Sequence, residues 1–121
     1  MTMTLTSVDK HGFRFRNWDI YRDSRDFRFL VYELLKKYPP EEKFALVDQT
    51  KRALTSTVLN IAEGANRGTD RDTKLFINRA HTSLDEAVAC LDCALDNCYI
   101  TLAEHDTALC QASSLARRLR K

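Results

Sequence analysis

Glycine and proline are scarce in this sequence, which has three Gly and two Pro among 121 residues. A sheet of short strands needs turn residues at close intervals, whereas a few long helices do not. Ala, Leu, Arg and Glu, which favour helices, are plentiful instead. The composition therefore predicts an all-α protein, and the length suits a single domain.

Long apolar runs are also missing. No stretch approaches the roughly 18 uninterrupted apolar residues that a membrane span requires, and residues 1–10 lack the apolar core of a secretory signal. We therefore expect a cytoplasmic protein with no membrane role.

The sequence lacks the residue spacing of a metal or catalytic centre. Cys90 and Cys93 form one CxxC pair inside a predicted helix, without the second pair that zinc sites use. With Cys98 and Cys110 they are interpreted as small apolar residues in or beside the core, and metal binding is the alternative. No helix carries the repeated Glu-x-x-His motif of metal bundles. We expect no enzyme and no cofactor, although four residues remain candidates for acid–base chemistry: Asp48, Glu63, His81 and Glu86.

Apolar residues recur at steps of three and four, as on one face of a helix. The clearest stripe contains Ile77, Ala80, Leu84, Ala87, Leu91, Ala94 and Cys98. Similar stripes place Phe44 inward on the second helix and Leu102 inward on the fourth. We predict an antiparallel up-down four-helix bundle over residues 13–121, preceded by a flexible arm at 1–12. Its helices are expected at 19–38, 40–63, 70–97 and 102–120.

Several polar residues predict how the helices end and how they register. Gly64 suits the left-handed position that closes a helix, while Thr69 or Asp70 and then Thr101 suit N-caps. Polar residues at helical steps on the second helix predict an internal network in which Glu63 meets Arg52 or Arg79. The proposed members of this structural polar network are Gln49, Arg52, Asn60, Glu63, Arg79 and Glu86.

Charge is strongly segregated along the chain. Residues 82–110 carry six acids and no Lys or Arg, whereas residues 111–121 carry four basic residues and no acid. Such asymmetry predicts surfaces of opposite sign, which can steer a charged partner, although a solvated surface explains it equally well. The candidate nucleic-acid-binding residues are Arg14, Arg16, Arg67, Arg71, Lys74, Arg117, Arg118, Arg120 and Lys121.

Each group of candidate cations has a structural alternative. Arg14 and Arg16 alternate with Phe13, Phe15 and Trp18, a pattern that clamps single strands but also staples an arm onto a bundle. The loop before residue 70 could hold a phosphate or simply cap a helix. The basic tail could bind phosphate or complement the helix dipole.

The motifs Asn60-Ile61-Ala62-Glu63-Gly64 and Ala80-x-x-Ser83-Leu84-x-Glu86 resemble those of the four helix bundle protein family, also called the 23S ribosomal RNA intervening sequence protein family. The resemblance runs from Phe15 to Ile100. It implies an up-down bundle that forms closed rings, commonly pentamers. Similar bundles are accessory proteins of diversity-generating retroelements, where they bind nucleic acid and a reverse transcriptase.

Two functions are therefore predicted. The first is a non-enzymatic oligomeric accessory protein that contacts RNA or DNA through basic patches. The alternative is a protein interaction module whose acidic surface, from Asp85 to Asp106, docks a basic protein partner.

Overall fold

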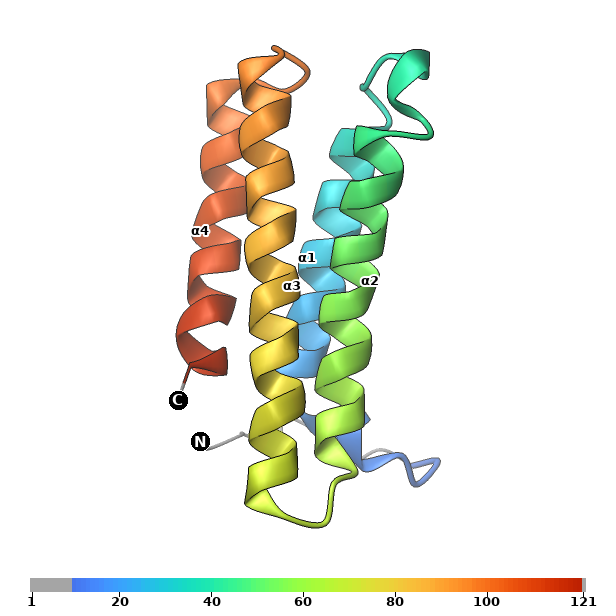
Figure 1. Cartoon of the computed structure of the whole chain (residues 1–121), viewed down its shortest axis with the longest axis vertical. Coiled ribbons are helices and arrows are strands. Elements are labelled where there is room, and N and C mark those ends of the chain that lie inside the picture. The colour runs from blue at the N-terminus through green and yellow to red at the C-terminus, as the bar shows by residue number, and fades with distance from the viewer. Residues whose placement is uncertain (1–9, 121) are drawn as a thin grey trace.

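The computed structural model describes residues 10–120, and its regular elements are helices. The α-helices are α1 (Asp19–Leu35), α2 (Leu46–Ala65), α3 (Asp70–Asp96) and α4 (Leu102–Leu119). Two 3-10 turns, η1 (Arg14–Asn17) and η2 (Pro40–Glu42), precede α1 and α2. The four helices run alternately up and down (Figure 1), which confirms the predicted all-α four-helix bundle. Much of the predicted arm lies outside the described residues.

The core follows the predicted stripes. Phe27, Leu54, Ile61, Leu84 and Leu115 are almost fully buried, so each helix contributes to one apolar interior. The small residues of α3 let neighbouring helices approach closely while the Leu side chains fill the remaining space. None of the helices within residues 10–120 is long and apolar enough to cross a membrane.

Two predicted caps are confirmed. The Thr69 side chain accepts a hydrogen bond from the backbone N–H of Asp72 at 3.2 Å, and this bond caps α3. Thr101 and Glu104 form a reciprocal capping box at the start of α4, with bonds of 3.1 and 2.9 Å.

The role predicted for Gly64 is wrong. Gly64 lies inside α2 and has no positive φ, because the helix continues to Ala65. A Cβ built at this position would lie 3.4 Å from side-chain atoms of Ile77 and Phe76. Gly64 therefore serves the close approach of α2 and α3. Among the non-glycine residues of 10–120, the one with a positive φ is Cys98 (62°), which follows the end of α3 and is exposed rather than part of the stripe.

The connection between α1 and α2 also differs from the prediction. The first helix ends at Leu35, and a 3-10 turn that starts at Pro40 precedes α2, which begins at Leu46. Phe44 lies in this connection and is 87 % exposed, so a helical stripe does not describe it. Leu102 is likewise 71 % exposed, because it occupies the first position of α4, beyond the packed part of that helix.

The predicted internal polar network is wrong as well. Five of its six members are exposed, and only Asn60 is half-buried. Arg52 pairs with Asp48 at 2.9 Å on the surface of α2, and Glu63 pairs at 3.0 Å with Arg67, which lies just beyond the end of that helix. Local pairs of this kind satisfy the charges without the desolvation that burial would cost. Two polar contacts do link α2 to α3: the Ser56 and Ser83 hydroxyls lie 2.8 Å apart, and the Thr73 hydroxyl donates to the Gly64 carbonyl oxygen at 3.1 Å.

Candidate nucleic-acid interface

Three segments that carry the candidate cations lie at one end of the bundle. Because the helices alternate in direction, η1, the turn between α2 and α3, and the end of α4 all lie toward the lower end in Figure 1. We call the described cations of these segments the arginine end; they are Arg14, Arg16, Arg67, Arg71, Lys74, Arg79, Arg117, Arg118 and Arg120. The predicted Lys121 lies outside the described residues.

The turn between α2 and α3 supplies the most accessible charges. Arg71 and Lys74 occupy the first turns of α3, are exposed, and form no ion pair with another residue of 10–120. Asp70 and Asp72 stand beside them, where carboxylates favour the start of a helix. Both cations therefore keep their charge available to an external anion.

Phe76 gathers two further arginines near this turn. The guanidinium carbon of Arg67 lies 4.1 Å from the ring centroid of Phe76, and that of Arg79 lies 4.9 Å away. These cation–π contacts hold the side chains without neutralising them, whereas the ion pair to Glu63 partly offsets the charge of Arg67. Arg79, expected in the interior, thus belongs to the arginine end.

The last turns of α4 are more strongly bound to the bundle. Arg118 reaches Asp23 at 2.6 Å and Asp19 at 3.4 Å, and so ties α4 to α1. Arg117 donates to the Ser113 hydroxyl at 2.9 Å. Arg118 is therefore balanced by two carboxylates, and its main role is structural.

Arg120 lies 3.2 Å from His81 Nε2, and His81 Nδ1 lies 3.4 Å from an Asp85 carboxylate oxygen. This chain of contacts joins the last turn of α4 to α3. Both ring nitrogens of His81, a candidate for acid–base chemistry, therefore contact other side chains.

The aromatic residues near η1 support the staple interpretation in part. The Phe15 ring lies 4.9 Å from the Tyr21 ring, edge to face, and Trp18 packs against the core. Phe13 is 56 % exposed beside Arg14 and Arg16. Phe15 and Trp18 thus anchor the segment, and Phe13 stays accessible.

A basic groove between α1 and α2 was missed by the sequence interpretation, which did not include its arginines among the candidate residues. Its volume is about 710 Å³, and it is lined by Arg22, Arg25, Asp26, Arg28, Phe29, Thr55, Val58 and Leu59. The three-residue spacing of Arg22, Arg25 and Arg28 was the sequence feature that could have indicated this groove. What the pattern could not show is that α2 provides the other wall.

Residues 82–110, which carry six acids and no Lys or Arg, form the later part of α3 and the first half of α4 and include the opposite end of the bundle. Asp92 contacts His105 at 2.8 Å, and Glu104 pairs with Lys37, which holds the pKa of Glu104 below its usual value. Tyr99 donates to Glu42 at 2.6 Å, and this hydrogen bond raises the pKa of Tyr99 to about 12. The acidic segment is thus partly paired at this end of the bundle, and the surfaces of opposite sign stay a prediction.

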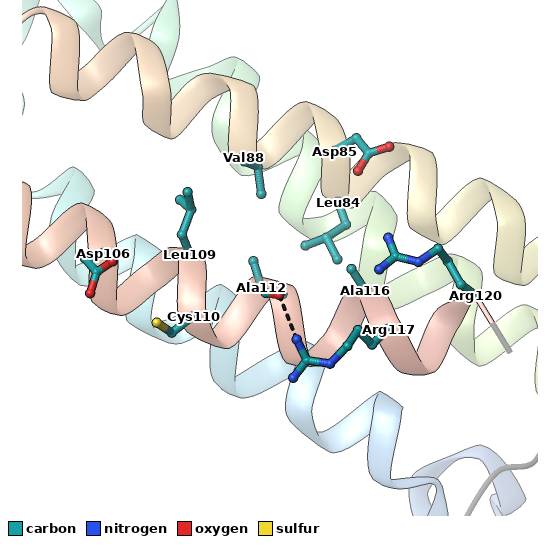
Figure 2. A pocket seen from close by; sticks show the side chains of 11 residues that line it. Leu84, Asp85, Val88, Asp106, Leu109, Cys110, Ala112, Ala116, Arg117 and Arg120 are labelled. Atoms are coloured by element: carbon teal, nitrogen blue, oxygen red, sulfur yellow. Dashed lines mark hydrogen bonds between the residues drawn. The ribbon is translucent and has the colours of Figure 1, made fainter.

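A second groove, between α3 and α4, has a mixed character (Figure 2). Leu84, Val88, Leu109, Ala112 and Ala116 give it an apolar floor within a volume of about 590 Å³. In Figure 2 the Asp85 and Arg120 side chains lie at the same end of this groove, at opposite walls.

Two buried titratable groups, the Tyr38 hydroxyl and the Cys90 thiol, lie away from the arginine end. Burial, with Cys90 and Glu104 nearby, raises the pKa of Tyr38 to about 12, and burial likewise raises the pKa of the Cys90 thiol. The Tyr38 hydroxyl has no hydrogen-bond partner within residues 10–120.

Over the same residues no group of three or more His, Cys, Asp and Glu side chains is arranged to hold a metal ion.

Comparison with known proteins agrees with this architecture. The antiparallel helices define a small all-α bundle protein. The chain belongs to the 23S rRNA-intervening sequence protein family, whose model matches residues 16–121.

A crystal structure of a protein of unknown function from the S23 ribosomal protein family of Bacteroides thetaiotaomicron has a similar fold. It aligns with a TM-score of 0.75 and 23 % identity, covering 83 % of this chain and 94 % of that chain. A search of curated proteins found no significant match.

Proposed function

We propose that this protein is a non-enzymatic accessory protein that binds RNA or DNA through its arginine end. The observation that carries the proposal is the convergence of three separate segments, η1, the α2–α3 turn and the end of α4, at one end of the bundle. The family's description refers to 23S rRNA, which supports RNA as the first ligand to test.

The charge distribution favours binding in one orientation. Cations at the arginine end attract a phosphate backbone, whereas the acids of residues 82–110 repel it from the α3–α4 face. The modest net charge of +2 therefore does not argue against binding, because the local charge at the contacted end decides it.

We further propose that the protein acts as a homo-oligomer, with a pentamer as the state that the family resemblance implies. The apolar floor of the α3–α4 groove supports association, because covering it removes apolar surface from water. An oligomer would repeat the arginine end and so strengthen a weak contact. Light scattering should give a mass several times the 14.0 kDa of one chain, and a monomer at micromolar concentration would remove this part of the proposal.

Fluorescence polarisation with a labelled single-stranded RNA of about 20 nucleotides tests the proposal. We expect the affinity of the wild type for this RNA to fall steeply as the salt concentration rises. The Arg71→Glu/Lys74→Glu variant should bind at least tenfold more weakly than the wild type. Removing two phosphate contacts should also reduce the slope of log affinity against log salt by about 1.4.

The matched control changes charge equally at the opposite end. Lys36→Glu/Lys43→Glu alters two exposed lysines near the α1–α2 connection. It should bind almost as the wild type does. Equal losses in both variants would mean that net charge alone governs binding, and no binding at low salt would end the proposal.

The second candidate is docking of a basic protein on the acidic surface. The exposed acids of α3 and α4 next to an apolar groove are the observation that favours it. A pulldown that recovers one partner after nuclease treatment, and loses it in Asp92→Lys/Asp106→Lys, would favour this function over nucleic-acid binding.

A further inference from the structure

We infer that the groove between α1 and α2 binds a single strand of nucleic acid, with the backbone on its arginines and a base on Phe29. The inference rests on the proposed function and extends it to a second site and a strand type. The groove is lined by three cations, Arg22, Arg25 and Arg28, and by one carboxylate, Asp26. Its net positive charge complements a polyanion.

Arg28 is held in position by neutral groups. Its Nε donates to Thr55 Oγ1 at 3.2 Å and its Nη2 donates to the Tyr32 hydroxyl at 3.0 Å. The guanidinium also lies 4.3 Å from the Tyr32 ring centroid. No carboxylate within residues 10–120 pairs with it, so the full charge and the remaining N–H donors are available to a phosphate. Because the side chain is already ordered, binding would cost little further entropy.

Arg25 is available in the same way. Its guanidinium carbon lies 5.7 Å from the Tyr21 ring centroid, again a neutral partner. Three-residue steps along α1 separate successive arginines by about 4.5 Å along the helix axis, so Arg22 and Arg28 are about 9 Å apart in that direction. This span allows contact with more than one phosphate of an extended strand.

The apolar residues of the groove favour a single strand over a duplex. Phe29 is 57 % exposed and Leu59 is 56 % exposed, although both are large apolar side chains. An aromatic ring beside arginines is the arrangement on which unpaired bases stack. A duplex presents no free base faces, so it would leave Phe29 unused.

The groove lies between the two helices that the η1 segment of the arginine end contacts. The η1 turn, which carries Arg14 and Arg16, contacts both α1 and α2, the two helices that form the walls of the groove. In Figure 1 this turn lies below α1 and beside the lower end of α2. A strand bound at the arginine end can therefore extend into the groove.

The test uses the full chain and one RNA sequence, offered as a single strand and as a duplex. Phe29→Ala leaves the charge unchanged, and it should weaken single-strand binding by at least about fivefold, the loss expected for one stacked base. It should leave duplex binding unaltered. Arg25→Gln should lower the salt slope for the single strand by about 0.7.

Phe44→Ala is the matched control, because Phe44 is exposed and lies near the opposite end of the bundle. It should change neither affinity. If Phe29→Ala binds the single strand as the wild type does, while Arg71→Glu/Lys74→Glu still loses affinity, the groove inference fails and the proposed function stands. If the wild type binds no RNA or DNA, both fail.

Light scattering on the same variants tests whether a second copy of the chain, rather than nucleic acid, occupies the groove. The mass of the assembly should be the same for Phe29→Ala and the wild type. A smaller mass for Phe29→Ala would identify the groove as a contact between copies and would overturn the inference.

Discussion

At the scale of single residues, Gly64 shows why composition and spacing are incomplete guides. A glycine near the end of an apolar run suits a left-handed helix end, and nothing in the sequence distinguishes this role from close helix packing. The structure shows the second role, since Ile77 and Phe76 lie 3.4 Å from the position of a Cβ.

The packing role of Gly64 predicts how two substitutions change the free energy of unfolding. Gly64→Ala should change the free energy of unfolding by less than about 1 kcal/mol, because the helix favours Ala and the contacts are at ordinary distance. Gly64→Leu should lower it by about 1–3 kcal/mol through overpacking against α3. Chemical denaturation measures both. A Gly64→Leu variant as stable as the wild type would contradict the packing role.

Glu104 gives a prediction about pH. The hydrogen bond from Lys37 and those at Thr101 hold the pKa of Glu104 below its usual value in the folded state. A lowered carboxyl pKa contributes stability that is present at neutral pH and is lost as the pH falls below 4.5, the usual value, toward the folded pKa. Glu104→Gln keeps the capping group and should lose less stability over that range.

Thermal denaturation between pH 7 and pH 3 checks this prediction. Glu86→Gln is the control, because Glu86 is exposed and forms no ion pair within residues 10–120. It should retain the acid dependence of the wild type. Identical pH profiles for Glu104→Gln and the wild type would contradict the role of the Lys37 contact.

At the scale of helices, the sequence predicts most of the fold. Periodic apolar positions place α3 within one residue of its observed bounds, and Thr69 and Thr101 mark the starts of α3 and α4 correctly. The connection of α1 to α2 was less predictable. Its prolines are compatible with either a helix start or a 3-10 turn, and tertiary packing decides between them.

The close packing of α3 gives a prediction for matched alanines. Ala87 is fully buried, and Ala89, two residues on, is exposed. Ala87→Leu should lower the free energy of unfolding by about 1–3 kcal/mol or more, because no space exists for the added atoms. Ala89→Leu should stay within about 0.5 kcal/mol of the wild type. Similar losses in the two variants would show that α3 is not packed as described.

At the scale of the whole molecule, the path of the chain converts a linear charge pattern into a spatial one. The candidate cations were predictable as residues, but their meeting at one end depends on the alternating helix directions. The sequence could not show that Arg118 would be balanced by Asp19 and Asp23. Nor could it show that Arg28 would be held by hydroxyl groups across a groove.

Ultraviolet cross-linking of the wild-type protein to single-stranded RNA, followed by mass spectrometry of the linked peptides, tests the central claim most directly. The account predicts cross-links in residues 13–29 and 66–79, which include η1, the first half of α1 and the α2–α3 turn. Cross-links confined to residues 82–110, the acidic part of α3 and α4, would contradict it.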